Sequence, residues 1–283
     1  MTTDNNADQI AEWNGVQGER WAKLRQETNG IVVPFGDAAT AAAAPQPGER
    51  VIDVGCGCGD TTIDLAQRVG ATGSVLGVDV SRPMLEAARE LGGLAGLPHV
   101  AFRECDASVA ELPGGTDLLY SRFGVMFFGD PVGAFTHLRG ALRPGGRCVF
   151  VCWRAPRDNP WTMVPLSAAR AALGITPPPA DPNAPGPFAF ADDNRVRSIL
   201  ENAGFDAIDL RRFDAPVTLG ATPHDAAGAL MRIGPVARLV REVGAVHQPV
   251  IVDAVEQALA PLAAADGRVS VQGSTWIVSA KNP

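Results

Sequence analysis

The sequence predicts an α/β fold with a doubly wound, parallel β-sheet, that is, with helices on both faces of the sheet. Three observations predict it. Short apolar runs alternate with helical periods from residue 50 to residue 153, and this alternation is typical of parallel sheets. A glycine-rich turn joins the first apolar run to its helix. The chain has 283 residues, 46% of them hydrophobic, which is enough to bury a substantial core.

The chain is expected to begin with helices. Residues 7–28 have a helical pattern that breaks near Gly15 and Gly18. Residues 35–44 are rich in alanine and form a second expected helix, because the sequence PQPGE that follows them predicts a stop.

Five strands and four helices are expected to follow. Ser81 as N-cap and Pro83 near the first turn mark the start of the second of these helices. A Pro-Gly-Gly stop at 144–146 comes before the fifth strand. The expected strands are 50–54, 74–80, 100–105, 116–122 and 146–153. The expected helices are 60–69, 82–91, a short one near 108–111, and 131–141.

The pattern changes after Trp153. Residues 154–190 contain nine prolines, and the stretch TPPPADPNAPGPF within them excludes regular structure. We expect an ordered loop or lid there, because the fold resumes directly after it. The remaining expected elements are a helix at 193–205 that Gly204 stops, a strand at 207–219, a mostly helical stretch at 223–265 and a last strand at 269–280.

Composition and charge argue against several classes of protein. A net charge of −7 and a pI near 5.1 argue against a nucleic-acid-binding surface, which needs clustered Lys and Arg. No apolar run reaches the ~20 residues of a membrane-spanning helix. The polar, acidic start MTTDNNADQI lacks the features of a signal peptide. We therefore expect a cytoplasmic protein without nucleic-acid or membrane partners.

The glycine-rich turn is the strongest functional signal. In VIDVGCGCGD, glycines at 55, 57 and 59 follow a buried strand and allow the main chain positive φ angles and close approach to a ligand. Asp79 ends the second strand, 20 residues after Gly59, where a carboxylate accepts hydrogen bonds from both hydroxyls of a ribose. Together they predict a nucleotide-type site.

The charges near this turn favour one ligand over another. A dinucleotide site has the spacing G-x-G-x-x-G, whereas here the third glycine comes one residue early and Asp60 follows it. Asp53 would repel a pyrophosphate but attract a cation. S-adenosylmethionine carries an ammonium and a sulfonium group and no phosphate, so it fits this pattern better. Two alternatives stay open: an NAD(P)-dependent oxidoreductase, and a catalytically inactive S-adenosylmethionine-binding regulatory protein.

Four stretches resemble successive motifs of the class I S-adenosylmethionine-dependent methyltransferases: VIDVGCGCGDTT, GVDVSRPMLEAAR, RECDASVAELP and DLLYSRFGVMFF. The likeness is strongest to the bacterial small-molecule branch that includes ubiquinone- and menaquinone-biosynthesis enzymes, and it is tight over residues 50–153. It implies a seven-stranded sheet of order 3-2-1-4-5-7-6 whose last strand, containing STWIVSA, is antiparallel. It also implies methyl transfer from S-adenosylmethionine to a small, partly apolar molecule, with S-adenosylhomocysteine as the product.

The resemblance also assigns cofactor-binding roles by position. Asp53 would lie near the ammonium group, Asp79 would hold the ribose, and Asp106 would face the adenine amino group. The residues implied around the methionine part are Asp53, Gly55, Gly57, Gly59, Ser121 and Arg122, the last two of which also open onto the substrate. Those implied around the ribose and adenine are Asp79, Val80, Met84, Asp106 and Ala107.

The N-terminal helices supply candidates for a lid. Trp13 and Trp21 lie about two helical turns apart, which allows them to share a face. They either close over the sulfonium through cation–π attraction or simply dock the helix, and Trp21, next to Arg20, is the better cofactor contact. In related enzymes such N-terminal segments form part of the lid. The substrate-pocket candidates are Trp13, Phe123, Asn159 and Trp161.

Neither a metal site nor a clear catalytic base is evident. Cys56 and Cys58 lack the second ligand pair of a zinc site, so we expect them to be small fillers beside the turn, and we expect no metal cofactor. Asp192 and Asp193 are expected to cap a helix. His224 is a candidate base on a substrate hydroxyl, with a surface histidine as the simpler interpretation.

We accordingly divide the chain into four parts: an N-terminal helical lid segment at 1–46, a cofactor-binding core at 47–153, a Pro-rich cap loop at 154–190, and a C-terminal part of the sheet at 191–283 with a helical insert near 221–268. Methyl transfer from a sulfonium is an in-line displacement by an already activated donor. It requires alignment and exclusion of water but no dedicated catalytic residue. The sequence leaves the acceptor atom and the oligomeric state open.

Overall fold

The protein divides into two compact units in the computed structural model, which describes residues 6–176 and 181–283. The first unit comprises Met1–Trp153, Asn183–Phe213 and Thr275–Pro283. The second comprises Arg154–Pro182 and Asp214–Ser274. Residues 1–5 of the expected lid segment and residues 177–180 of the expected cap loop lie outside the described residues.

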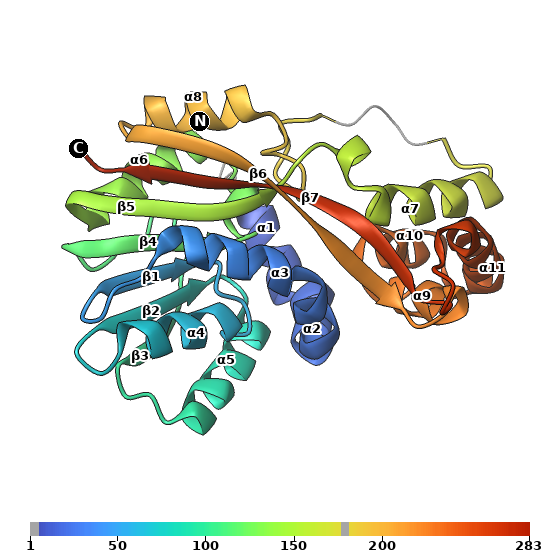
Figure 1. The fold of residues 1–283 in the computed structure, drawn as a ribbon, viewed down its shortest axis with the longest axis horizontal. Coiled ribbons are helices and arrows are strands. Elements are labelled where there is room, and N and C mark those ends of the chain that lie inside the picture. The colour runs from blue at the N-terminus through green and yellow to red at the C-terminus, as the bar shows by residue number, and fades with distance from the viewer. Residues whose placement is uncertain (1–5, 177–180) are drawn as a thin grey trace. The chain divides into compact units, whose positions relative to one another are not determined.

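A seven-stranded sheet of order β3-β2-β1-β4-β5-β7-β6 organises the first unit (Figure 1). β1 to β5 pair in parallel, and β7 runs antiparallel to β5 with Phe150 opposite Val278. The predicted strand order and the antiparallel last strand are confirmed. The strands are β1 (Arg50–Val54), β2 (Ser74–Asp79), β3 (Val100–Glu104), β4 (Thr116–Arg122), β5 (Leu142–Trp153), β6 (Asp206–Gly220) and β7 (Val269–Lys281).

The strand order identifies where a ligand is expected to bind. The chain passes from β1 outward to β2 and β3, and then returns to place β4 on the other side of β1. In open α/β sheets, ligands bind outside the carboxyl ends of the strands at such a switch point. The glycine-rich turn after β1 and the residues that end β4 therefore meet at one edge of the sheet.

Helices join the strands of the first unit, and two of them differ from the prediction. The helices are α1 (Ala7–Asn14), α2 (Val16–Lys23), α3 (Arg25–Ala43), α4 (Asp60–Val69), α5 (Arg82–Ala95), α6 (Pro131–Ala141) and α8 (Asp193–Asn202). The expected break at Gly15 is present, but Gly18 lies buried inside α2. The expected helix at 35–44 is the end of α3, which continues through Pro34 because Ile31, Phe35 and Ala39 bury one face of it.

Three further expectations about local structure need correction. The short helix near 108–111 is a turn, in which the amides of Val109 and Ala110 donate to the Asp106 carbonyl. α5 runs on to Ala95, beyond the expected end at 91. β5 begins at Leu142, because a register shift opposite Thr116 accommodates the Pro-Gly-Gly sequence within the strand.

The second unit is mainly helical. It holds α7 (Pro160–Ala172), α9 (Pro223–Leu230), α10 (Gly234–Val243) and α11 (Gln248–Leu259). The expectation of an irregular loop throughout 154–190 is therefore wrong for α7, where Pro160 occupies the first turn. α11 contributes Ile251, Val255 and Leu259 to the core at a spacing of four residues, and all three are fully buried.

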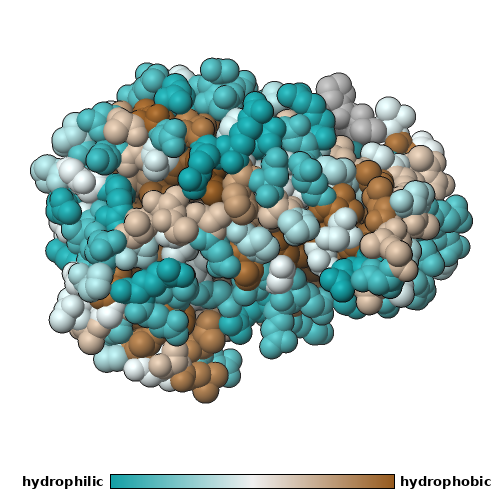
Figure 2. Space-filling view, in the orientation of Figure 1, coloured by the Kyte–Doolittle hydropathy of each residue, from teal (hydrophilic) through white to brown (hydrophobic). Residues whose placement is uncertain are grey.

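The surface drawn in Figure 2 is mainly hydrophilic, with small apolar patches between the polar side chains. Within residues 6–176 and 181–283, no helix has the length and apolar character needed to span a membrane.

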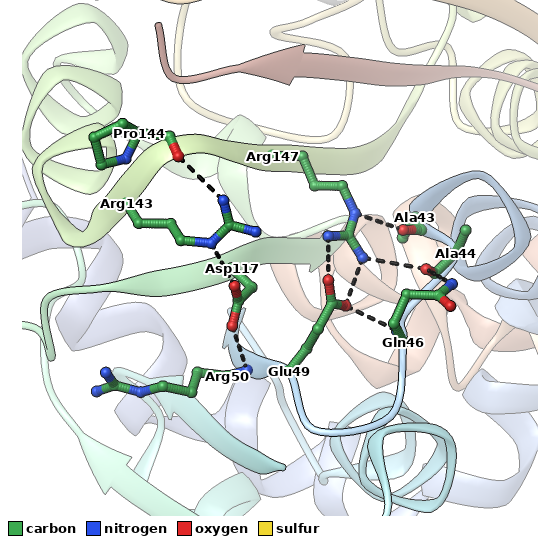
Figure 3. A network of polar contacts seen from close by, with 9 residues as sticks. All are labelled: Ala43, Ala44, Gln46, Glu49, Arg50, Asp117, Arg143, Pro144 and Arg147. Atoms are coloured by element: carbon green, nitrogen blue, oxygen red, sulfur yellow. Dashed lines mark hydrogen bonds and ion pairs between the residues drawn. The ribbon is translucent and has the colours of Figure 1, made fainter.

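A polar clamp fastens the C-terminal end of α3 to the sheet (Figure 3). Both terminal nitrogens of Arg147 donate to the carboxylate of Glu49, at 2.6 and 2.7 Å, and its Nε donates to the carbonyl of Ala43 at 2.7 Å. Ala44 ends the helix in a left-handed conformation, and its carbonyl also accepts from Arg147. Arg147 thus satisfies carbonyls that a helix end leaves unpaired.

The stability that the clamp contributes depends on whether the Glu49 carboxyl is protonated. Burial acts to raise the pKa of Glu49, but the hydrogen bonds from Arg147 and from the Gln46 amide outweigh it and hold that pKa below its usual value of 4.5. A carboxyl whose pKa is lowered by folding stabilises the fold above its ordinary pKa, and this contribution disappears as the pH falls through the lowered value.

Replacing Arg147 with methionine is expected to lower the free energy of unfolding by about 1.5–3 kcal/mol, because hydrogen bonds to charged groups contribute about that much. Urea unfolding at pH 7 measures the difference, and the difference should shrink as the pH falls below 4.5. Arg238→Met is the matched control, because Arg238 pairs with Glu242 on an exposed helix face and such pairs contribute about 0–1 kcal/mol. Equal losses in both variants would contradict the clamp.

Candidate functional site

The turn after β1 has the backbone conformation that the glycines predict. Gly55, Gly57 and Gly59 have φ angles of 68°, 56° and 84°, a region that residues with a Cβ rarely adopt. A Cβ on Gly55 would also lie 2.8 Å from the Cα of Gly124, which follows β4. The turn therefore needs glycine for two reasons: its left-handed conformation, and the close approach of two main chains.

Asp53 is a fully buried carboxylate one residue before the end of β1. Its Oδ2 accepts hydrogen bonds from the hydroxyls of Thr61 and Thr62, both at 2.7 Å, on the first turn of α4. Its Oδ1 is buried and has no hydrogen-bond partner among residues 6–176 and 181–283. Burial raises the pKa of Asp53 to about 6, although the two threonine hydroxyls and the charge of Arg122 act to lower it.

An unpartnered buried carboxylate oxygen is unusual, because buried polar atoms nearly always have a partner. The ammonium group of S-adenosylmethionine, the cofactor that the resemblance implies, is a cation with N–H donors, and it would satisfy this oxygen. A pyrophosphate, which is an acceptor with negative charge, would not. The residues at this turn therefore fit the implied cofactor.

Asp79 links the end of β2 to the glycine-rich turn. Its Oδ2 accepts from the amide of Gly57 and its Oδ1 accepts from the amide of Ser81, both at 2.8 Å. Burial raises the pKa of Asp79, and these backbone hydrogen bonds act to lower it. Because each carboxylate oxygen accepts more than one hydrogen bond, both keep capacity for the two hydroxyls of a ribose.

Asp106 lies at the end of the next strand, after β3. Its Oδ1 accepts from the amide and the hydroxyl of Ser108, at 2.9 and 2.7 Å. Its Oδ2 accepts from the side-chain amide of Asn6 at 2.8 Å. The amide of Cys105 donates to the Asp79 carbonyl, so the ends of β2 and β3 are adjacent and their two carboxylates belong to one edge of the sheet.

The other residues implied around the cofactor also lie at this edge. Met84 reaches the turn, because a Cβ on Gly57 would lie 2.8 Å from its terminal methyl group. The hydroxyl of Ser121 donates to the Val54 carbonyl at 2.7 Å and accepts from the Gly124 amide, so it braces β1 against β4. Val80 and Ala107 directly follow Asp79 and Asp106, and Ala107 is buried.

Helices α1 and α2, which we call the lid helices, are fastened to the loop after β2. The side-chain amide of Asn14 donates to the Val80 carbonyl at 2.7 Å, and its oxygen accepts from the Arg82 amide at 3.0 Å. The hydroxyl of Ser81 donates to the Trp13 carbonyl at 2.7 Å. These contacts hold the lid helices over residues that the cofactor is expected to touch.

Trp13 and Trp21 belong to different helices, not to one continuous face as expected, but their rings do meet at 5.8 Å in an edge-to-face arrangement. Trp13 also packs edge-to-face against Phe127, which follows β4, at 5.4 Å. The carbonyl of Trp21 lies 4.0 Å from the Cys58 sulfur in the glycine-rich turn. Both tryptophans are thus placed at the same edge of the sheet as the turn.

The start of α3 adds a polar connection that the sequence did not predict. Arg25 pairs with Asp60 through two hydrogen bonds at the first turn of α4. Asn29 accepts from Arg122 at 2.8 Å. Like the hydrogen bonds of Asn6 and Asn14, these join residues that are far apart in the sequence. No local sequence motif predicts them for that reason.

Phe123 directly follows β4 in a left-handed conformation, with φ of 61°, which is strained for an aromatic residue. Its ring stacks on Trp153 at 4.4 Å and meets Phe35 edge-to-face at 6.2 Å. Phe213 packs edge-to-face on Phe35 at 6.0 Å. We call Phe35, Phe123, Trp153 and Phe213 the aromatic cluster.

The remaining predicted residues lie in the second unit. Asn159 is fully buried, and its oxygen accepts from the Ser274 amide and from the Trp161 ring nitrogen. Its amide nitrogen donates to three carbonyls, those of Arg154, Ala155 and Ser274. Asn159 and Trp161 thus hold the second unit together internally. His224 is exposed and pairs with Glu256 at 2.9 Å, which raises its pKa.

The cysteines beside the turn are buried. Cys56 and Cys58 are 4% and 7% exposed. Burial raises the pKa of the Cys58 thiol to about 12 and that of Cys56 well above its usual value, so both stay protonated and unreactive near neutral pH. Among the residues that the structure describes, no group of three or more His, Cys, Asp or Glu is placed to hold a metal ion. At the start of α8, Asp192 accepts from the amides of Asn194 and Arg195, and Asp193 lies in the first turn.

Comparison with known proteins finds similarity to methyltransferases. Residues 51–146 match a family model described as a methyltransferase domain. The chain is 35% identical over 118 residues to aklanonic acid methyltransferase DauC from Streptomyces sp. strain C5, which is 41% of this chain and 54% of that protein. It is 28% identical over 190 residues to nocamycin O-methyltransferase from Saccharothrix syringae, 64% of this chain and 67% of that protein.

The fold has similar solved structures as well. The YcgJ protein from Bacillus subtilis matches with a TM-score of 0.58 and 16% identity, over 88% of this chain and 98% of that one. The sequence matches are less complete: the chain spans only about half of the length of several curated relatives. The residues matched by the family model, 51–146, include the glycine-rich turn and the carboxylates of Asp53, Asp79 and Asp106.

Replacing Gly18 with alanine is expected to detach the lid helices. The new Cβ would overlap the Trp13 carbonyl and lie 2.5 Å from the Ser81 hydroxyl, which form one of the hydrogen bonds that hold α1 to the loop after β2. Hydrogen–deuterium exchange should become faster in α1 and α2. Gly30→Ala is the matched control, because Gly30 lies in α3 and a Cβ added to it would meet no atom within 4 Å. Unchanged exchange in Gly18→Ala would contradict this account of the lid.

The pKa of Asp53 predicts a pH dependence of cofactor binding. The ammonium group pairs with the ionised carboxylate, and below a pKa of about 6 binding must first remove a proton. The affinity for S-adenosylhomocysteine should therefore rise about tenfold from pH 5 to pH 7, measured by calorimetry. Asp53→Asn should bind more weakly and lack this rise. A variant that retains the same slope would show that another group titrates.

Proposed function

We propose that this chain is a class I S-adenosylmethionine-dependent methyltransferase and that it transfers a methyl group from S-adenosylmethionine to a small, partly apolar molecule. The match of residues 51–146 to a methyltransferase domain and the similarity to named methyltransferases support this. The observation that carries the proposal is the buried, unpartnered Oδ1 of Asp53 beside the glycine-rich turn. This oxygen is a hydrogen-bond acceptor without a donor, and the ammonium group of the cofactor is a cationic donor that would fit it.

Three carboxylates each bind a different part of the cofactor. Asp53 takes the ammonium group, Asp79 takes the ribose hydroxyls and Asp106 takes the adenine amino group. They follow, or nearly follow, three neighbouring strands, and each group they take donates hydrogen bonds. Ser121 and Gly124 keep the ends of β1 and β4 together, which leaves the reactive sulfonium end of the cofactor beside the residues that follow β4.

S-adenosylmethionine supplies the activated methyl group, so the protein's part is to align the acceptor and exclude water. The lid helices cover the loop after β2 and thereby remove water from the site. In the aromatic cluster near the end of β4, Phe123 and Phe213 are partly exposed, whereas Phe35 and Trp153 are buried. Such rings favour an acceptor with apolar, flat surface, and the strained backbone of Phe123 is maintained for that placement.

The relatives support a small organic acceptor. Their names describe methylation of aklanonic acid and O-methylation of nocamycin. We extend from them only the size class of the acceptor. An acceptor that must lose a proton needs a base; His224 remains a candidate, although its pairing with Glu256 in the second unit makes a surface role the simpler interpretation.

Two alternatives give different experimental results. An NAD(P)-dependent oxidoreductase would need to place a pyrophosphate beside the buried carboxylate of Asp53, which electrostatic repulsion opposes. An inactive regulatory protein would bind the cofactor equally well but transfer nothing. Calorimetry with S-adenosylhomocysteine and with NADH separates the first alternative. Transfer of labelled methyl from S-adenosylmethionine to components of a metabolite extract separates the second.

Replacing Asp79 with alanine is expected to weaken S-adenosylhomocysteine binding by about 10- to 100-fold, because one or two hydrogen bonds to a charged group are lost. Labelled methyl transfer at low cofactor concentration should fall in parallel. Asp206→Ala, an exposed aspartate at the start of β6, is the control and should bind as the wild type does. Heat on mixing with NADH but none with S-adenosylhomocysteine would overturn the proposal.

A further inference from the structure

Asn6 occupies the carboxylate that the adenine is expected to use. Its Nδ2 donates to Oδ2 of Asp106 at 2.8 Å, across 100 residues of sequence. The other oxygen of Asp106 is already engaged twice by Ser108, which fixes the orientation of the carboxylate. Asn6 therefore lies at the one oxygen of Asp106 that is left for a ligand.

The side-chain oxygen of Asn6 has no partner. A carboxylate only accepts hydrogen bonds, so Asn6 must turn its NH₂ group toward Asp106, and its Oδ1 is the atom that remains. That oxygen is buried and makes no hydrogen bond with any residue in the described part of the chain. A buried acceptor without a donor is costly, by about 1–3 kcal/mol for a typical group, and it marks a place where a donor is missing.

An adenine edge supplies the missing donor. Its amino group has two N–H bonds, and a ring nitrogen beside it is an acceptor. The oxygen of a carboxamide accepts from such an amino group, as it does when asparagine reads adenine in DNA. Asp106 and Asn6 together would then use both N–H bonds of the amino group.

We propose that Asn6 is a further cofactor-binding residue, which reads the adenine edge together with Asp106. The inference rests on the proposed function, because it takes S-adenosylmethionine as the ligand. The lid helices position Asn6, since α1 begins directly after it and is held by the contacts of Asn14 and Trp13 with the loop after β2. The residue that we propose to recognise the base is therefore held in place by the same contacts that fasten the lid helices.

The test compares two ligands that differ only in the base. S-adenosylhomocysteine carries the amino group, whereas S-inosylhomocysteine carries a carbonyl oxygen in its place and an N–H at the neighbouring ring nitrogen, so the position that Asn6 and Asp106 would accept from holds an acceptor. Calorimetry gives the dissociation constant of each ligand, and their ratio measures discrimination of the base. The wild type should bind the adenosine form at least tenfold more tightly.

Asn6→Ala should weaken binding of S-adenosylhomocysteine by about two- to tenfold, the range of one net hydrogen bond, and should affect S-inosylhomocysteine less, so that the ratio falls. Asn202→Ala is the matched control, because Asn202 is exposed on α8 and bonds only to the Ser198 hydroxyl. Thermal unfolding of both variants checks that each is folded.

Each outcome decides the inference. A fall in the ratio for Asn6→Ala alone supports it. Equal weakening of both ligands would show that Asn6 acts only in closing the lid, and no change would show that it is not a ligand; either overturns the proposal. If the wild type bound neither ligand, the proposed function itself would fail, and that result is distinct from the other two.

Discussion

The buried charge of Asp53 is the constraint around which the first unit is arranged. A carboxylate without water needs donors, and the structure provides two hydroxyls from the first turn of α4 for one oxygen and none for the other. The glycines that follow give the main chain after β1 its positive φ angles. In the proposed function, the ammonium group of the cofactor supplies the donor that the second oxygen lacks.

In the proposed site, the cofactor-binding residues belong to separate elements at one edge of the sheet. β1, β2 and β3 each end near a carboxylate, and each carboxylate is oriented by donors from its own turn: Thr61 and Thr62 for Asp53, amides for Asp79, and Ser108 for Asp106. The lid helices meet these turns mainly through main-chain atoms and two asparagines. In the proposed site, the strands therefore supply the charged carboxylates, and the N-terminal segment covers them and adds hydrogen bonds.

The fold could be predicted from the sequence to a large extent because its signals are local. Glycine spacing, strand-length apolar runs and helix stops located β1 to β4 within a residue, and the family resemblance supplied the order of β5, β7 and β6. Pro34 inside α3, α7 in the proline-rich stretch and the bulge in β5 could not be predicted, because packing outweighs local propensity there. Asn6, Asn14 and Arg25 were missed for another reason: their partners lie 35 to 100 residues away.

The clamp at Arg147 has a consequence for movement of the lid. It anchors the C-terminal end of α3 to β5, while Tyr120 bonds the carbonyl of Gly36 in the middle of the same helix and Arg25 anchors its beginning. α3 is therefore anchored at its beginning, in its middle and at its end. The backbone is non-helical at Gly15, between α1 and α2, and at Leu24, between α2 and α3, so a movement of the lid helices relative to α3 would turn at these two residues.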